Sequence, residues 1–229
     1  MKNSKVLYSL LFALLIPTMG KSQTAAELIK QVRLRLDKVN DYEAKAKMKT
    51  NVSFIKAPEA EVKIYFKKPN KLRINNESGI SFIPKGSVNI NLNTIFTQGD
   101  GSYDIIDMGK EDKTGLRIIK LLPKDENADI ALSTLYIDEK QFLIKRSKTT
   151  SKDNGTYELE MTYGKYAQWG LADKVVFSFN TKDYKLPKGV TFDYDDGTQP
   201  NKPKEKKGTV EISYTNYTIN EGVPDSVFQ

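Results

Sequence analysis

The residue types that most often carry catalysis are missing from this chain, because it contains neither histidine nor cysteine. Without histidine, the commonest general base and the commonest metal ligand are both absent. Without cysteine, thiolate nucleophiles and zinc–thiolate sites are excluded. The sequence also lacks a G-x-S-x-G elbow, a P-loop and a dinucleotide-binding glycine motif. Acidic groups are what remains to be considered.

Two groups of acidic residues have a spacing that bears on catalysis or metal binding. The three aspartates within residues 193–196 suggest calcium, but the segment lacks the full ligand spacing and runs on into lysines. Glu158 and Glu160 alternate with Leu159 and Met161, so we expect them on the solvated face of a strand rather than as a glycosidase pair. The sequence therefore predicts a protein that is not an enzyme, with no catalytic residue, no metal site and no cofactor.

The N-terminal residues have the pattern of a secretory signal peptide. A basic start is followed by an apolar run from Val6 to Ile16 and by small residues that lead to a cleavage site after Ser22. The run is much shorter than the roughly 20 residues that span a bilayer, which disfavours the alternative of an uncleaved anchor. We expect residues 1–22 to be removed and residues 23–229 to form one soluble, monomeric domain in the periplasm.

Composition narrows the class of protein further. A chain without cysteine forms no disulfide and cannot carry the N-terminal acyl anchor of a bacterial lipoprotein. The formal net charge is +7, but basic and acidic residues are interspersed, as on a solvated outer face. No aromatic–basic motif occurs, so nucleic-acid binding is poorly supported. A weak attraction of the protein to anionic lipid headgroups remains an alternative for its basic residues.

One helix is predicted over residues 24–40. Thr24 and Glu27 have the spacing of a capping box, and the apolar residues after them recur on one face. That face consists of Leu28, Ile29, Val32, Leu36 and Val39. An amphipathic helix must lay its apolar face on another element, most simply the concave side of a sheet.

From Glu43 onward, apolar and polar residues alternate, which is typical of antiparallel strands with one buried face. Short strands are also expected within residues 80–107, a short helix or irregular segment within residues 109–131, and a flexible loop at residues 195–208. Strands that share one continuous apolar face must curve around a common interior, so the sequence predicts a sandwich or a barrel. The alternating segments are residues 43–54, 61–67, 71–74, 135–144, 157–163, 175–179 and 209–218.

Three stretches together resemble the LolA family of periplasmic lipoprotein carriers. They are residues 28–42, where the helix runs into a strand, residues 62–73, with a Lys68-Pro69-Asn70 turn between two strands, and the tail at residues 222–228. The resemblance implies a mainly β fold, a strongly curved antiparallel half-barrel that is unclosed, with a few helices as a lid over an apolar cavity. Such carriers take the acyl chains of outer-membrane lipoproteins from an inner-membrane transporter and pass them to an outer-membrane acceptor.

An acyl chain needs an apolar lining and no directional contact, because each buried methylene gains about 0.8 kcal/mol. For each residue of the expected lining, the alternative is ordinary core packing. The side chains expected to line the cavity are Met48, Val62, Ile64, Phe66, Leu72, Ile74, Leu135, Ile144, Leu159, Met161, Phe177 and Phe179. Those expected on the lid are Leu28, Val32 and Leu36.

Lys68 is the point where the sequence departs from the family. The resemblance implies an arginine here that ties the lid to the barrel, whereas lysine keeps the charge but loses the bidentate fork. Lys68 is therefore a candidate for a weaker latch, or else a solvated lysine at a strand end. Because one fold serves many functions, a periplasmic sensor or regulatory module that recognises a protein partner is the second hypothesis for the chain, and an envelope enzyme is the third.

Overall fold

The computed structural model describes residues 23–52, 55–56, 59–78, 101–152, 155–180 and 207–229. Several expectations fall outside these residues. They are the signal peptide at residues 1–22, Phe54, the strands expected within residues 80–100, the aspartates of residues 193–196 and most of the loop at residues 195–208. Among the described helices, none has both the length and the apolar character that crossing a bilayer requires.

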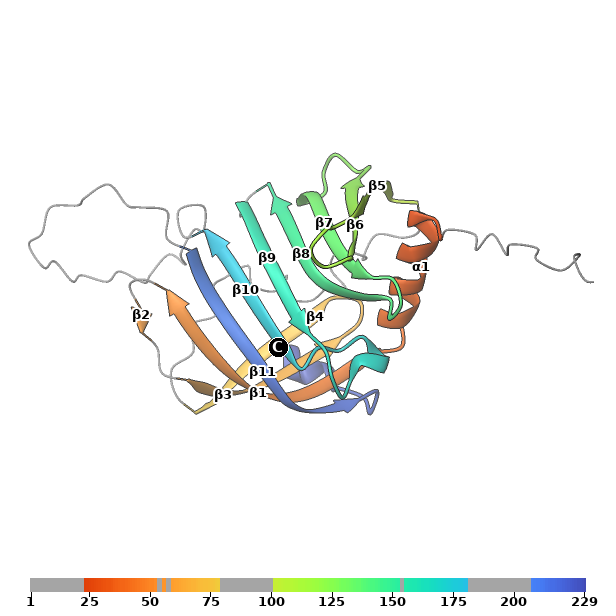
Figure 1. The fold of residues 1–229 in the computed structure, drawn as a ribbon. Coiled ribbons are helices and arrows are strands. Elements are labelled where there is room, and N and C mark those ends of the chain that lie inside the picture. The colour runs from red at the N-terminus through yellow and green to blue at the C-terminus, as the bar shows by residue number, and fades with distance from the viewer. Residues whose placement is uncertain (1–22, 53–54, 57–58, 79–100, 153–154, 181–206) are drawn as a thin grey trace, which may run out of the picture.

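The chain forms one strongly curved antiparallel sheet of eleven strands (Figure 1). Its order is β4-β3-β1-β11-β10-β9-β8-β7-β6-β5, with the short β2 also paired to β1. In the described part of the chain the terminal strands β4 and β5 do not pair with each other, so the half-barrel is open, as the resemblance to the LolA family implied. The strands are β1 (Asp41–Val52), β2 (Ile55–Lys56), β3 (Ala60–Lys67), β4 (Lys71–Ser78), β5 (Tyr103–Lys110), β6 (Arg117–Pro123), β7 (Ile130–Asp138), β8 (Leu143–Ser151), β9 (Gly155–Thr162), β10 (Lys174–Asn180) and β11 (Lys207–Ile219). The helices are α1 (Ala25–Leu36) and the 3-10 turns η3 (Ala167–Trp169) and η4 (Asp225–Phe228).

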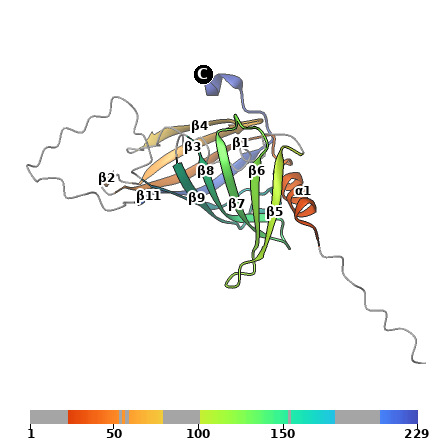
Figure 2. The same ribbon diagram turned by 90° about the horizontal axis from the view of Figure 1, so that it is seen from above.

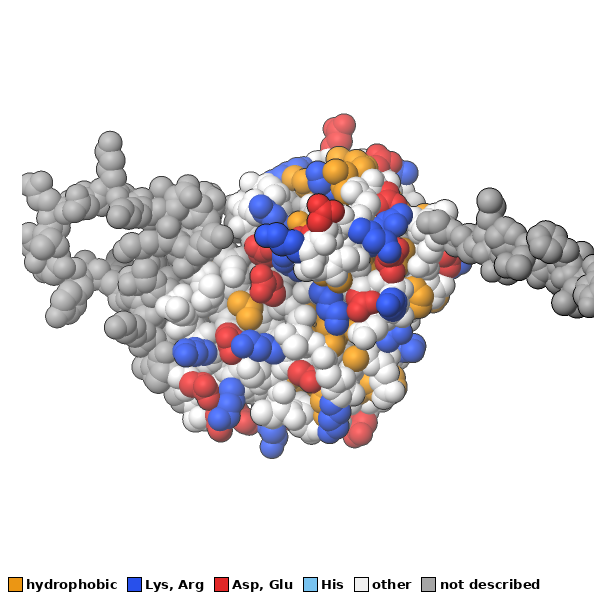
Figure 3. Space-filling view, viewed as in Figure 1, with side chains coloured by type: hydrophobic (Ala, Val, Ile, Leu, Met, Phe, Trp, Pro, Cys, Tyr) orange, Lys and Arg blue, Asp and Glu red, His pale blue; other side chains and the backbone are white. Residues whose placement is uncertain are grey.

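Small side chains and bulges allow the sheet to bend. On the concave face of β1, Ala44 and Ala46 lie opposite the larger Ile64 and Val62 of β3. A register shift in the β1–β11 pair falls directly before Ala46, and bulges of this kind bend a strand and increase its twist. The polar residues between these positions point to the outer face. On the outer surface seen in Figure 3, basic and acidic side chains are accordingly intermixed.

The segment at residues 109–131 was expected to be helical or irregular, and that expectation is wrong. It contains the end of β5, the whole of β6 and the start of β7. Ile119 and Leu121 are buried on the concave face, while Ile118 and Leu122 lie on the other face of the same strand. Because both faces of β6 carry apolar residues, the period of two that marks a strand is hidden in the sequence.

Helix α1 lies across the open end of the half-barrel, beside β5 and η3 (Figures 1 and 2). It begins as predicted, with the backbone N–H of Glu27 donating to the Thr24 hydroxyl at 3.2 Å. Its apolar face is buried at Leu28, Ile29 and Val32. The helix ends at Leu36, four residues earlier than expected, and a non-helical link continues to β1.

The link between α1 and β1 is held by residues that are distant in sequence. Asn220 has a left-handed backbone conformation (φ 60°), and its side-chain oxygen accepts from the N–H of Asn40 at 2.7 Å. Its side-chain nitrogen donates to the carbonyl of Lys38 at 2.8 Å. The N–H of Lys68 donates to the carbonyl of Asn40 at 2.8 Å. The base of α1 is therefore fixed to both β11 and the β3–β4 turn.

The C-terminal tail packs against β4 as η4 (Figure 2). The carboxylate of Asp225 is 3.0 Å from the Lys67 ammonium and 2.9 Å from that of Lys71. Hydrogen bonds from Lys71 and Lys67 lower the pKa of Asp225. These contacts lie apart from α1, which makes them useful controls for the contacts at the base of the helix.

Candidate functional site

The candidate site is the concave face of the half-barrel together with the buried face of α1. Both belong to one continuous apolar cluster. Ten of the twelve residues expected to line a cavity are buried in it, and Leu72 and Ile74 at the edge strand β4 are half-buried against it. Of the expected lid residues, Leu28 and Val32 are buried and Leu36 is half-buried. The ten buried residues are Met48, Val62, Ile64, Phe66, Leu135, Ile144, Leu159, Met161, Phe177 and Phe179.

The deepest of these side chains leave no space for a guest beside them. Phe66, Leu135 and Leu159 each have 0% of their surface exposed. A side chain without accessible surface is packed on all sides, so the structure is a closed form at these positions. Entry of an acyl chain would require α1 or part of the sheet to move.

Sequence reasoning missed one wall of this interior, an aromatic group below the base of α1. The ring of Tyr217 is centred 5.2 Å from Tyr42, 4.8 Å from Tyr166 and 4.9 Å from Tyr214. The Tyr217 hydroxyl donates to the carbonyl of Ala172 at 2.8 Å. Burial raises the pKa of Tyr217 and Tyr42, and raises that of Tyr214 to about 12, so these hydroxyls are neutral near pH 7.

The concave face also carries a row of hydroxyl groups that sequence reasoning missed. Strand β8 turns Ser147, Thr149 and Ser151 inward at alternate positions, and all three are buried. Ser133 on β7 and Tyr157 on β9 flank Thr149 in the register. Ser147, Thr149 and Ser151 occupy alternate positions of the sequence, and this spacing was the available signal. Because none of the three is apolar, the spacing did not identify an inner face.

Two of these hydroxyls are unsatisfied. The hydroxyls of Ser133 and Thr149 lie 3.1 Å apart and bond to each other. Within the described residues, the buried Ser147 Oγ and Tyr157 hydroxyl make no hydrogen bond of normal geometry, although the Thr149 hydroxyl lies near enough to act on the Tyr157 oxygen. Burial raises the pKa of Tyr157 to about 12, and the neighbouring Thr149 hydroxyl offsets this only in part. Buried hydroxyls are normally hydrogen-bonded, so this pair requires an explanation.

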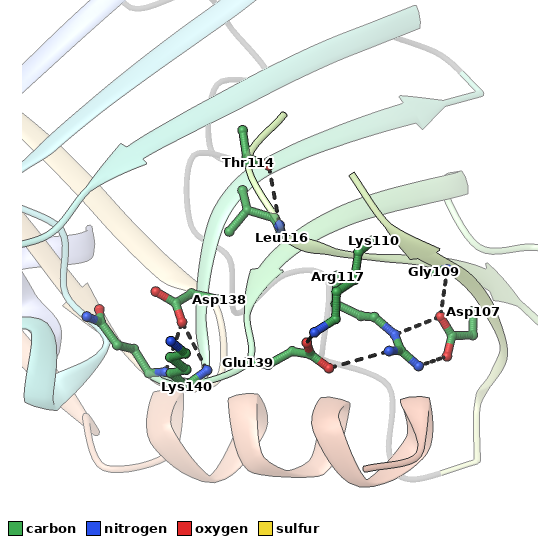
Figure 4. Close-up of polar contacts among 10 residues, drawn as sticks. Asp107, Gly109, Lys110, Thr114, Leu116, Arg117, Asp138, Glu139 and Lys140 are labelled. Atoms are coloured by element: carbon green, nitrogen blue, oxygen red, sulfur yellow. Dashed lines mark hydrogen bonds and ion pairs between the residues drawn. The ribbon is translucent and has the colours of Figure 1, made fainter. Parts of the chain in front are cut away.

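Charged residues gather at the rim of the half-barrel beside α1 (Figure 4). Arg117 on β6 donates from Nε to Asp107 on β5 at 2.9 Å and makes a second bond to the other carboxylate oxygen. Glu139, in the β7–β8 turn, lies 3.5 Å from Arg117 and 2.6 Å from the Lys110 ammonium. The group joins β5 and β6 to the β7–β8 turn, next to the helix.

The pKa of Asp107 is lowered, chiefly by the hydrogen bond from Arg117. A lowered carboxyl pKa contributes stability that is complete above the ordinary value of 3.8 and is lost as the pH falls through the native value. Asp107→Asn should therefore lower the Tm at pH 7 by about 1–3 °C, and the difference from wild type should vanish toward pH 2. Thermal unfolding followed by circular dichroism from pH 2 to 7 measures this difference.

Asp104→Asn is the matched control for Asp107→Asn, because it lies on the same strand with a side chain that is 69% exposed and only a loose contact to Lys124 at 3.7 Å. Its Tm should follow wild type across the whole pH range. An Asp107→Asn effect that persisted unchanged at pH 2 would contradict the role given to the Arg117 pair.

Lys68 contacts the C-terminal end of α1. Its ammonium donates to the carbonyl of Asp37 at 2.9 Å and to its carboxylate at 3.1 Å. We call this pair the latch contact. Cations are favourable at a helix C-terminus, where the carbonyl dipoles point outward.

Glu158 and Glu160, which were considered as a catalytic pair, lie on the outer face of β9, where Glu158 is 3.6 Å from Arg146.

Comparison with solved structures identifies the fold. The chain is similar to a putative outer-membrane lipoprotein-sorting protein domain from Vibrio parahaemolyticus, with a TM-score of 0.56, 8% identity, and coverage of 89% of this chain and 95% of that chain. It is also similar to a LolA-superfamily protein from Nitrosomonas europaea (TM-score 0.52, 9% identity, 91% and 98% covered) and to a DUF1329-family protein from Desulfovibrio piger (TM-score 0.52, 13% identity, 91% and 98% covered). No family model and no curated protein matches the sequence. The LolA-like fold is therefore confirmed, and the low identities carry the comparison no further than the fold.

Proposed function

We propose that this chain is an exported, periplasmic carrier that holds the acyl chains of a lipid or lipoprotein between α1 and the concave face of the half-barrel. The observation that carries the proposal is the apolar cluster shared by the helix and the sheet at the open end of the fold. A site of that kind holds methylene chains and needs none of the catalytic residues that the sequence lacks. An inner-membrane transporter and an outer-membrane acceptor are the partners that such a role implies.

Since the interior is packed, α1 must act as a lid that opens. Its buried Leu28, Ile29 and Val32 together gain about 5–9 kcal/mol from burial. An acyl chain of about fifteen methylenes gains about 12 kcal/mol gross when it takes their place. The exchange is favourable, and the anchored link at residues 38–40 lets the helix swing without leaving the protein.

The experiment is to purify the protein from a periplasmic extract, extract bound lipid with organic solvent and analyse it by mass spectrometry. The stripped protein is then titrated with a fluorescent fatty-acyl probe in competition with unlabelled fatty acid. The proposal predicts extractable lipid and saturable, competable probe uptake. It is wrong if folded protein, verified by circular dichroism, neither carries lipid nor takes up the probe.

Lys68→Ala should raise the rate of acyl-probe uptake by a factor of about 1.4 to 5, because breaking a half-exposed ion pair of about 0.2–1 kcal/mol makes the lid easier to open. Stopped-flow fluorescence measures the rate, and the Tm should fall by no more than about 3 °C. Lys71→Ala removes a comparable ion pair, to Asp225, that does not touch α1. A rate change of equal size in Lys71→Ala would contradict the role of the latch contact.

The alternative function is a sensor or regulatory module that binds a protein partner. One observation favours it, namely that Ile106 and Met108 on the edge strand β5 are 43% and 50% exposed. Exposed edge strands with apolar side chains are common sites of strand addition. This alternative predicts a complex in envelope extract that survives removal of all lipid and is lost in Ile106→Lys, whereas the carrier proposal predicts that Ile106→Lys leaves probe uptake unchanged.

A further inference from the structure

The row of hydroxyls on β8 interrupts an interior that is otherwise apolar. Ser133 and Thr149 share one O–H···O bond, and among the described residues the O–H groups of Ser147 and Tyr157 reach no acceptor at hydrogen-bonding geometry. The Thr149 hydroxyl acts on the Tyr157 oxygen, which leaves the Tyr157 proton free to donate. Ser147 is 0% and Tyr157 4% exposed, so bulk water does not reach them. An unpartnered buried hydroxyl destabilises a folded protein. Two such hydroxyls on one face indicate a ligand that accepts their hydrogen bonds when it is bound and leaves them without an acceptor when it is released.

Ser147 and Tyr157 are placed to act on one group. Ser147 lies opposite Leu159, and Tyr157 lies two residues before Leu159 on the same strand, so the two occupy diagonal positions on the concave face. Diagonal neighbours on paired strands are roughly 7–8 Å apart at the backbone, within reach of a long side chain such as tyrosine. A single acceptor that lies above Leu159 on the concave face is therefore within reach of both hydroxyls.

We propose that Ser147 and Tyr157 donate hydrogen bonds to the carbonyl oxygen of an esterified acyl chain whose methylenes occupy the interior. The inference rests on the proposed carrier function and adds to it the chemical class of the guest. It also gives the guest a fixed depth, because the ester must stop at β8 and β9 while the hydrocarbon extends along the apolar rows.

A neutral carbonyl fits the surroundings better than a carboxylate. In the strand register the residues directly opposite Ser147 and Tyr157 are Leu135, Leu159, Thr149 and Phe179, none of which carries a charge. Burial holds the pKa of Tyr157 at about 12, so its hydroxyl remains a proton donor near pH 7. A carboxylate without a cation beside it would be strongly disfavoured in such an interior, whereas an ester carbonyl needs only the two donors.

The test compares three pyrene-labelled probes of equal chain length, namely a methyl ester, the free acid and a plain hydrocarbon. The full protein and its variants Ser147→Ala and Tyr157→Phe are titrated with each probe. Each variant should bind the ester about three- to tenfold more weakly and the hydrocarbon with unchanged affinity. The Tm of the lipid-free variants should equal or exceed that of wild type, because each substitution removes an unsatisfied hydroxyl.

Thr150→Val is the matched control, since Thr150 lies on the same strand with its hydroxyl bonded to Thr156 at 2.9 Å on the opposite face. It should change no probe affinity. Equal binding of ester and hydrocarbon by wild type, unaffected by either variant, would overturn the ester site and leave the carrier intact. Tighter binding of the free acid, lost in both variants, would overturn the ester in favour of a carboxyl group. Failure to bind any probe would overturn both proposals.

Discussion

Replacing Val32 by aspartate should lower the free energy of unfolding by about 3–5 kcal/mol. Val32 lies at the centre of the buried face of α1, and a carboxylate there has to be either buried without a partner or released by undocking of the helix. The helix undocks if undocking costs less free energy than burying the charge. The measured decrease in unfolding free energy therefore cannot exceed the free energy with which α1 docks on the half-barrel. Urea denaturation followed by tryptophan fluorescence and circular dichroism provides the value.

Leu34→Asp is the control for Val32→Asp, because Leu34 lies on the same helix with 51% of its surface exposed. Its unfolding free energy should fall by no more than about 1 kcal/mol, the cost of an aspartate in the last turn of a helix. Undocking in Val32→Asp should also expose the interior and increase binding of a hydrophobic dye while the sheet remains folded. A loss below about 1 kcal/mol would mean that α1 does not close the interior.

Gly208→Ala should destabilise the protein by about 1–3 kcal/mol through overpacking. Gly208 on β11 lies opposite Phe179 on β10, and a Cβ atom built on this glycine would lie 2.5 Å from the Phe179 ring. The ring occupies the space that any side chain at position 208 would need. Chemical denaturation of the single variant measures the cost.

A second substitution separates this clash from the loss of a glycine as such. Phe179→Leu removes the ring atoms that a methyl group at position 208 would meet. In a double-mutant cycle, Gly208→Ala should cost at least about 1 kcal/mol less in the Phe179→Leu background than in wild type. Additive effects would show that the cost arises from backbone preference instead of from the contact with Phe179.

The strands that could be predicted are those whose two faces differ in polarity. Val62, Ile64 and Phe66 alternate with charged or polar residues, and β3 is buried at these positions as expected. The same rule failed for β6, where Ile118 and Leu122 on the outer face hide the alternation. The alternation of apolar and polar residues cannot reveal a strand that is apolar on both faces, whether that strand lies at the edge or in the middle of the sheet.

The candidate site was predictable to the same degree. The apolar rows of the concave face could be predicted from the alternation of apolar and polar residues. The contact between Lys68 and Asp37 could not, because it depends on where α1 ends, and the predicted end lay four residues too late. Ser147 and Tyr157 become neighbours only through the β8–β9 register. Sequence periodicity assigns a residue to a face of its strand and carries no information on which residue of the next strand lies beside it.

The position of β11 has a consequence for how the protein acquires its structure. This strand is inserted between β1 and β10, and the Thr215 hydroxyl, for example, bonds to the carbonyl of Lys45, 170 residues earlier. Pairings between such distant segments raise contact order and slow folding. The two arms of the sheet, β4-β3-β1 and β10 to β5, stay unjoined until the last strand is available. The sheet of the described residues therefore cannot be completed before the C-terminal strand has been synthesised.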